Sequence, residues 1–365
     1  MHFKHAAIAA AAALALLVTA ACSGSATPPV VSDTAPPAET STSMTLSSAA
    51  PDTSSSEIAT TSTSAATTSS EQPHGPTDPL TGLAVSNNPV IAVKIENTDA
   101  GMPQYGVADA DIIYTEQVEG GLVRLIAIYH TVLPTEVGAV RSVRSTDVQL
   151  LPSYGAPILV YSGGATAQLT RLRGSDLIAT TEGAPGFWRS KVKRAPYNLH
   201  ANLQTIAKRY PGKAKAQPMG FEFAVNDPRL GSATKVTSID VTMVNGKTSF
   251  RYADARYQAY FWDKPYLDAV GDKHLFVDNV LIQRVDDSQL DGTLDPAGNP
   301  SHLTKTLGSG SFTLYRDGRA ITGTWSRSKV SDPTRYLDGS GKPVLLKPGK
   351  TWVLLAPSNA QIVRK

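Results

Sequence analysis

Residues 23 to about 73 constrain the fold most, because almost nothing in them can enter a hydrophobic core. The tract consists largely of Ser, Thr, Ala and Pro, with hardly any aromatic or large aliphatic side chain. Such a composition cannot bury enough apolar surface to offset chain entropy, so we expect it to be disordered. The globular region must therefore be built from about residue 75 to the end of the 365-residue sequence.

The first 22 residues predict an export signal that ends in a lipid attachment site. A cationic start is followed by an unbroken apolar run from Ala6 to Val18, which suits a signal peptide better than a membrane span of about 20 residues. The run ends in Val18-Thr19-Ala20-Ala21-Cys22, which is similar to the lipobox of bacterial lipoproteins. We expect acylation (palmitate) of Cys22, extracytoplasmic anchorage to the outer face of the cell membrane, and a tether over residues 23–74.

The cysteine count and the balance of charge limit the kinds of site and partner that the globular part can have. Cys22 is the single cysteine, which excludes disulfides, zinc–thiolate sites and cysteine nucleophiles. Nucleotide and zinc-protease motifs are missing and the seven His are scattered, so we predict no cofactor and no metal site. After residue 74 the sequence has 33 Lys and Arg against 26 Asp and Glu. This balance favours anionic wall polymers or lipid headgroups as partners, and no basic helix or stripe indicates nucleic acid.

The two halves of the globular part show different hydrophobic patterns. In residues 75–212, apolar runs predict strands over 90–95, 112–114, 122–129 and 156–161. In the same half, helical spacing of the apolar residues predicts helices over 165–173 and 199–210. In residues 213–365, alternation predicts strands over 238–244, 257–262, 279–284, 311–315, 320–325 and 351–355. We therefore predict an α+β protein, with an α/β-type N-terminal domain over 75–212 and a mostly antiparallel β C-terminal domain over 213–365.

The densest polar chemistry lies in the first half. Arg141 and Arg144, three residues apart, would share one helix face with Asp147 and could bind an anion near the helix start. Asn198 could cap the following helix, and His200 could be a general base or a ligand, although a lone His is more often structural. The equally open alternative for the arginines is an ion-pair network with acidic side chains that only holds loops.

We expect one concave, basic site in the first half, because the charged candidates lie beside glycines, prolines or predicted strand ends. Glu119 would be the internal counter-charge of the arginines. The residues expected to converge are Glu119, Arg124, Arg141, Arg144 and Asn198. The full set of ligand-binding candidates adds two more side chains, Asp147 and His200.

Several ordered motifs resemble one family along residues 76–357. In the first half they include Asp78-Pro79-Leu80-Thr81-Gly82-Leu83, Gly138-Ala139-Val140-Arg141-Ser142-Val143-Arg144 and Ala195-Pro196-Tyr197-Asn198-Leu199. In the second half they include Gly323-Thr324-Trp325-Ser326 and Gly349-Lys350-Thr351-Trp352-Val353. The chain is similar to the YerB-like lipoproteins, which carry a domain of unknown function numbered 3048. Where the family pattern has His and then an aromatic residue, this chain has Tyr197 and His200.

The resemblance implies a two-part architecture but no reaction, so two functions stay open. The first is a lipid-anchored envelope protein that binds an anionic cell-wall component or a wall-assembly partner. The second is a hydrolase or transferase acting on wall glycan or a phosphodiester, with Glu119 or Asp147 working beside Arg141 and Arg144. Carboxylate general acid–base chemistry needs two acids about 5–10 Å apart across a cleft. The missing nucleophile motifs and the basic balance favour binding.

Overall fold

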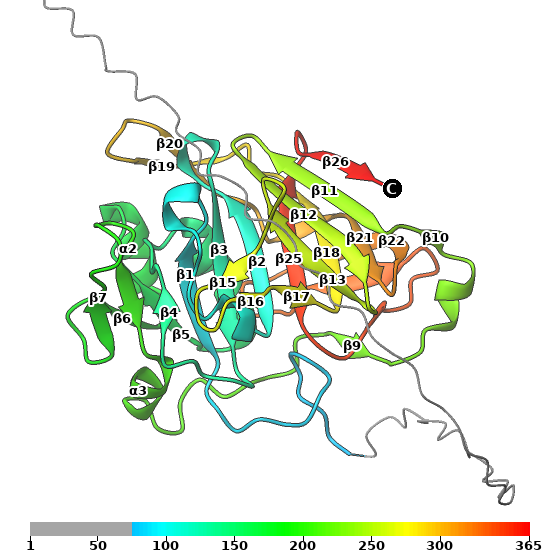
Figure 1. The fold of residues 1–365 in the computed structure, drawn as a ribbon, viewed down its shortest axis with the longest axis horizontal. Helices are drawn as coiled ribbons and strands as arrows, with labels where there is room; N and C mark the ends of the chain where they lie inside the picture. Colours follow the sequence, from blue (N-terminus) through cyan, green and yellow to red (C-terminus); the bar gives the residue numbers. More distant parts are fainter. Residues whose placement is uncertain (1–74) are drawn as a thin grey trace, which may run out of the picture. The chain divides into compact units, whose positions relative to one another are not determined.

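Strands dominate the computed structural model, which describes residues 75–365 (Figure 1). The predicted signal peptide, Cys22 and the tether up to residue 74 lie outside the described residues. Among the described residues, no helix is long and apolar enough to span a membrane.

A large mixed sheet runs through the whole described region. Its strand order is β10-β22-β21-β18-β25-β2-β3-β1-β5-β6, with β23 paired to β22. The strands are β1 (Ile91–Glu96), β2 (Ile112–Gln117), β3 (Val123–Tyr129), β5 (Ile158–Tyr161), β6 (Ile178–Thr181), β10 (Thr234–Lys235), β18 (Asn279–Val285), β21 (Gly308–Arg316), β22 (Arg319–Arg327), β23 (Arg335–Asp338) and β25 (Thr351–Pro357). Strands from both halves of the sequence thus join in one sheet, where β25 pairs in parallel with both β2 and β18.

A second, antiparallel sheet packs on one face of the large one. Its order is β14-β13-β12-β11-β26, and β17 pairs with β13. The strands are β11 (Ser238–Met243), β12 (Gly246–Ala253), β13 (Arg256–Phe261), β14 (Lys264–Pro265), β17 (Phe276–Val277) and β26 (Gln361–Arg364). Phe250 and Trp352 meet edge to face between the sheets, with ring centroids 5.4 Å apart. This contact lies in the larger apolar core, which also holds Val241 and Ile282.

Short elements cover the rest of the sheet. The helices are α1 (Ser145–Leu150), α2 (Thr166–Arg173) and α3 (Leu203–Lys208), with 3-10 turns η1 (Asp99–Gly101), η2 (Val107–Asp109), η3 (Glu119–Gly121), η4 (Leu151–Tyr154) and η5 (Pro228–Gly231). The small strand sets are β4 (Val137–Gly138) with β8 (Leu199–Ala201) and β7 (Phe187–Arg189), β9 (Glu222–Phe223) with β24 (Leu345–Leu346), β15 (Leu267–Asp268) with β16 (Lys273–His274), and β19 (Leu290–Leu294) with β20 (Pro300–His302). Leu150 of α1 and Leu172 of α2 enter the second apolar core, on the other face of the large sheet.

The structure corrects the predicted α/β character of the N-terminal part. The chain is β-rich overall, and β1, β2 and β3 pair antiparallel rather than through crossover helices. The physical reason is the short connection between β2 and β3, which holds only the η3 turn and so returns the chain directly alongside itself. Parallel pairing in this half is confined to β1, β5 and β6. The antiparallel character of much of the second half is confirmed.

Candidate functional site

A fully buried lysine lies at the centre of the predicted charged region. Lys94 of β1 is inaccessible to solvent, yet its Nζ forms ion pairs with Glu116 of β2 and with Asp147 of α1, the latter at 2.8 Å. Burial lowers the pKa of Lys94 to about 8, because the neighbouring Asp147 carboxylate only partly offsets the loss of hydration. Asp147 also accepts the backbone N–H of Arg144 at 2.6 Å, which fixes the start of α1.

A second buried carboxylate holds two of the predicted arginines together. Glu96 of β1 forms ion pairs with Arg141 and with Arg124 of β3, the latter at 3.0 Å. Burial, with the nearby arginines adding to it, lowers the pKa of Arg124 to about 10, although Glu96 opposes this shift. The guanidinium of Arg141 also lies over the ring of Tyr197, 5.4 Å from its centroid. Glu96 is therefore the counter-charge that the protein itself supplies to Arg124 and Arg141.

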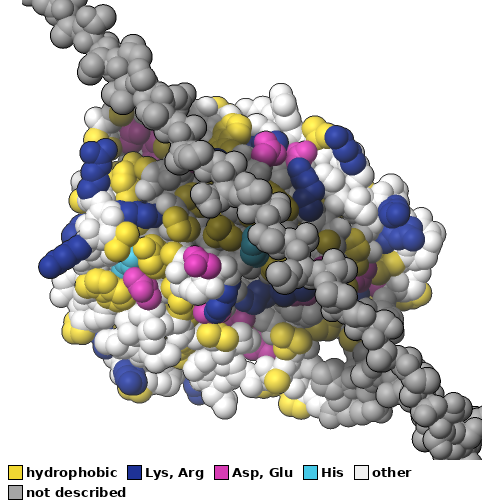
Figure 2. All heavy atoms as spheres, viewed as in Figure 1, with side chains coloured by type: hydrophobic (Ala, Val, Ile, Leu, Met, Phe, Trp, Pro, Cys, Tyr) yellow, Lys and Arg dark blue, Asp and Glu magenta, His cyan; other side chains and the backbone are white. Residues whose placement is uncertain are grey.

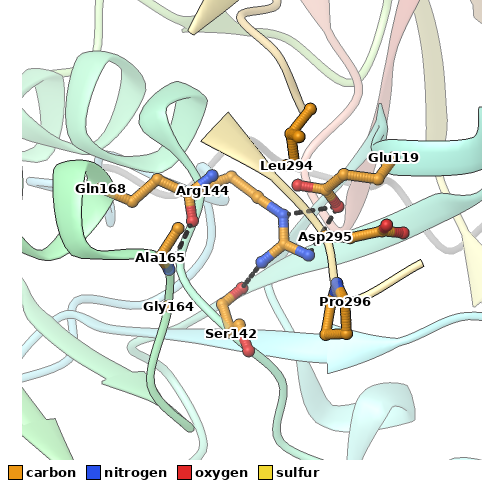
Figure 3. A pocket seen from close by; sticks show the side chains of 9 residues that line it. All are labelled: Glu119, Ser142, Arg144, Gly164, Ala165, Gln168, Leu294, Asp295 and Pro296. Atoms are coloured by element: carbon orange, nitrogen blue, oxygen red, sulfur yellow. Dashed lines mark hydrogen bonds and ion pairs between the residues drawn. The ribbon is translucent and has the colours of Figure 1, made fainter. Parts of the chain in front are cut away.

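Arg144 and Glu119 form a further ion pair, and both residues line a pocket of about 430 Å³, shown in Figure 3. Arg144 donates from Nε and Nη2 to the same oxygen of Glu119, at 2.9 and 2.6 Å. The other carboxylate oxygen accepts the hydroxyl of Ser301 at 2.6 Å, so the hairpin formed by β19 and β20 is held to this site. The remaining lining residues are Ser142, Gly164, Ala165, Gln168, Leu294, Asp295 and Pro296.

An acid–base role for Glu119 requires surroundings that raise the pKa of its carboxyl group, whereas the surroundings in the structure lower it. Burial alone would raise the pKa of Glu119, but the Arg144 guanidinium outweighs burial and lowers it. A general acid at neutral pH needs a raised pKa. Asp147, the other carboxylate considered, is buried completely and engaged by Lys94, away from any substrate. The geometry thus gives neither residue the environment of a glycosidase acid.

Four cations and four carboxylates make up the whole charged cluster: Lys94, Arg124, Arg141 and Arg144 with Glu96, Glu116, Glu119 and Asp147. Their formal charges cancel, and every guanidinium already has a carboxylate partner. Of the seven ligand-binding candidates, only Glu119 and Arg144 line the pocket of Figure 3. The cluster therefore offers little net attraction for an anion.

Asn198 and His200 lie apart from these ion pairs, at the β7–β8 hairpin (residues 187–201). Asn198 accepts a hydrogen bond from Arg189 at 2.8 Å and donates to the backbone oxygen of Ser190 at 3.0 Å. It does not cap a helix, because residues 199–201 form β8 and the cap of α3 is Asn202. Buried His200 lies 2.7 Å from Glu136 through Nδ1, and burial, which outweighs this carboxylate, lowers its pKa.

Three members of the charged cluster escaped the sequence analysis: Lys94, Glu96 and Glu116. Lys94 and Glu96 lie inside an apolar run, and Glu116 ends another strand, so the pattern predicts only buried strands there. The available signal was the charge itself, since Lys and Glu are almost never fully buried unless they are paired. No group of three or more His, Cys, Asp or Glu residues within 75–365 is arranged to hold a metal ion.

Positive charge gathers in one stretch, residues 160–215, here called the basic segment. It carries ten Lys and Arg against two acidic residues, whereas the rest of the sequence after residue 74 carries 23 against 24. The segment contains α2, β6, β7, β8 and α3, which lie together at the β6 edge of the large sheet (Figure 1). Figure 2 shows Lys and Arg side chains on this side of the molecule. Among the described residues, only Arg171 and Arg189 of the ten have a carboxylate within 4.0 Å.

Comparisons with known proteins agree with the resemblance seen in the motifs. A protein of Bacillus subtilis (strain 168) described as "Putative lipoprotein YerB" is 25% identical over 294 residues, which span 76% of this chain and 86% of that protein. The crystal structure of YerB from Bacillus subtilis superposes with a TM-score of 0.66 at 22% identity, covering 79% of this chain and all of that one, and so shows the same fold. Residues 80–217 match the family described as the N-terminal domain of a protein of unknown function (DUF3048), and residues 239–353 match its C-terminal domain. With both domains matched in order, the predicted membership is confirmed and the chain belongs to the DUF3048 family.

Proposed function

We propose that this chain is a lipid-anchored protein of the cell envelope that binds an anionic envelope polymer through its basic segment. Cys22 at the end of an export-signal pattern supports the anchor, and so does the word lipoprotein in the description of the Bacillus subtilis relative. The ligand class rests on one observation: the entire positive excess of the globular part lies in residues 160–215. A surface with one sign of charge attracts polymers of the opposite sign and raises their association rate.

The β7–β8 hairpin presents part of this charge to solvent. Arg189 is held by Glu182 and Asn198, and Lys193 donates to the backbone oxygens of residues 101, 102 and 103. These two fixed cations brace the hairpin. Lys191 and Arg194 are exposed, and their side chains form no hydrogen bond or ion pair within the described part of the chain. They are therefore the groups through which we expect the hairpin to contact a polymer.

Charge reversal on the hairpin tests this proposal. Lys191→Glu/Arg194→Glu should weaken binding of the purified full chain to isolated cell walls by about tenfold or more, because each contact between a basic side chain and an anionic surface contributes about 1 kcal/mol. Binding is measured by co-sedimentation at several salt concentrations. The matched control is Lys329→Glu/Lys342→Glu, which changes the net charge equally at exposed lysines outside the basic segment. The control should bind almost normally, and the affinity of the hairpin variant should depend less on salt.

Two results would contradict the proposal. Equal losses in the hairpin variant and the control would show a general charge effect rather than a surface on the basic segment. Unchanged binding of the hairpin variant, with the fold intact by circular dichroism, would show that the polymer does not contact the hairpin.

The anchor has its own test. Cys22→Ala should release the protein from the membrane fraction into the medium or leave it uncleaved, because no thiol remains to be acylated. Fractionation followed by immunoblotting measures the outcome. A variant that stays membrane-bound and fully processed would contradict lipid attachment at Cys22.

A further inference from the structure

One face of the large sheet changes from apolar to polar at its edge. On β18, β21 and β22, alternate residues point to the side that carries the six-stranded sheet. Val280 and Ile282 on this face lie in the apolar core. Farther along the strands, the same face carries Arg284 and a ladder of hydroxyls. Ser311 lies opposite Thr324, and Thr313 lies opposite Thr322.

A groove follows this polar face beside the edge strand β26. A cavity of about 490 Å³ is lined by Arg284, the hydroxyl ladder and Arg364 of β26, over the buried ring of Tyr315. A second cavity of about 460 Å³ shares Thr322 and Arg364 with the first and is also lined by Lys235 of β10 and by Lys365, which follows β26. The two cavities are therefore neighbours, and the groove that they make up together is lined by four cations and several hydroxyls.

The groove lacks side-chain carboxylates, in contrast to the cluster around Lys94. Neither cavity is lined by an Asp or Glu within the described part of the chain. The acids near its rim are engaged elsewhere: Asp338 pairs with Arg229 at 2.7 Å, and Asp240 of the neighbouring strand pairs with Arg251 at 2.8 Å. The backbone oxygen of Lys365 accepts N–H groups of the adjacent strand. Arg284 uses one nitrogen for two backbone oxygens and lines the same cavity as Arg364, and among the described residues neither arginine has a carboxylate within 4.0 Å.

Two guanidiniums that share a cavity repel each other unless an anion lies between them. At Arg124 and Arg141 the protein supplies that anion, Glu96, from its own chain. At Arg284 and Arg364 residues 75–365 supply none, and the hydroxyl ladder beside them offers donors and acceptors that suit sugar or polyol hydroxyls. The lining is therefore complementary to a ligand that carries acidic groups along a hydroxylated chain.

We propose that this groove is a second ligand site, separate from the basic segment, and that it binds an oligomer bearing phosphate or carboxylate groups together with hydroxyls. Arg284 and Arg364 hold one acidic group between them, and Lys235 and Lys365, which line the second cavity, hold a second. The basic segment includes the end of β5 and all of β6, at one end of the large sheet. In the strand order, β21 and β22 lie toward the opposite end. The two surfaces can therefore engage different anionic chains at the same time.

Calorimetric titration of the purified full chain tests the site with two probes, tripolyphosphate and a short oligogalacturonate. Arg284→Gln/Arg364→Gln should weaken binding of at least one probe by about tenfold or more. The probe that binds identifies phosphate or carboxylate as the preferred group. Because Arg284 also supports the backbone near residue 360, Arg364→Gln alone is measured as well, since Arg364 is exposed. It should weaken the same probe by about threefold or more.

Lys329→Gln/Lys342→Gln removes the same charge elsewhere and should leave binding unchanged. Lys191→Glu/Arg194→Glu separates this site from the basic segment and should also retain probe binding at the groove. The proposal is wrong if neither probe binds at millimolar concentration, if both arginine variants bind like the unchanged chain, or if the lysine control loses as much affinity as they do.

Discussion

Replacing Lys94 with Met should destabilise the folded chain by about 3–5 kcal/mol at pH 7, because removal of one partner of a buried ion pair leaves the other charge uncompensated. The side chain of Lys94 is inaccessible to solvent and contacts two carboxylates. Without Lys94, Asp147 still accepts the Arg144 N–H, but Glu116 keeps no cation, and its second oxygen is already without a hydrogen-bond partner. The loss would be a large fraction of the total stability of a typical domain, about 5–15 kcal/mol.

Urea unfolding followed by tryptophan fluorescence gives the free energy of unfolding from the midpoint and slope. Lys94→Met/Glu116→Gln should recover part of the loss, since the double variant no longer buries an unpaired charge at Glu116. Lys329→Met, at an exposed lysine, should stay within about 0.5 kcal/mol of the unchanged chain. A loss below about 1 kcal/mol for Lys94→Met, or a double variant no more stable than the single one, would refute the assigned ion pair.

The pH dependence of the same variant gives an independent check. The pKa of Lys94 in the folded chain is about 8, below its ordinary value of 10.5, because burial disfavours the charged amine. Between these pH values, the unfolded chain binds a proton that the folded chain has released, so this group makes the free energy of unfolding rise with pH. Lys94→Met lacks this contribution. The stability gap between unchanged and variant chains should therefore widen by about 1–3 kcal/mol from pH 8 to 10.

The other predictions concern the buried pair of Asp78 and His130 and the glycine turn at residues 120–121. Burial alone would lower the pKa of His130, but Asp78, 3.1 Å from its Nε2, outweighs burial and raises it. The pair should stabilise the fold fully below about pH 6.5 and lose that contribution as pH rises through the raised pKa of His130. Thermal unfolding measured from pH 5 to 8 should show this loss in the unchanged chain and not in the variant His130→Gln. Gly121 has φ +70°, and a Cβ there would lie 2.4 Å from Val244, so Gly121→Ala should cost about 2–4 kcal/mol by urea unfolding. Gly120→Ala has φ +65° but meets no atom closer than 3.6 Å, so it should cost about 1 kcal/mol; equal losses would contradict the predicted clash.

The individual strands were largely predictable, because apolar runs and alternation are local signals. The run over residues 90–95 became β1, and the run over residues 351–355 became most of β25. Their pairing was not predictable, since nothing near residue 351 encodes a partner at residue 112. The assumption of crossover helices then led to the incorrect α/β character.

The candidate site was predictable in its residues but not in its balance of charge. Glu119 and Arg144, which stand beside glycines and a helix start, do form a pair that lines a pocket. Lys94 and Glu96 sit within a strand pattern, where hydrophobic periodicity gives no reason to single them out. The groove at Arg284 and Arg364 depends on two strands that are about eighty residues apart in the sequence, so only the fold brings it together.

The place of β25 in the large sheet has a consequence for the order in which the chain acquires its structure. Because a polypeptide is synthesised from its N-terminus, β2 and β3 are available long before residues 351–357 arrive. Until then the apolar edge of β2 stays open, and such edges invite aggregation or proteolysis. Pairing across so many intervening residues also makes slow folding expected. A chain cut short before residue 351 would lose the middle of its sheet rather than a margin, and would leave β2 and β18 each with a bare edge.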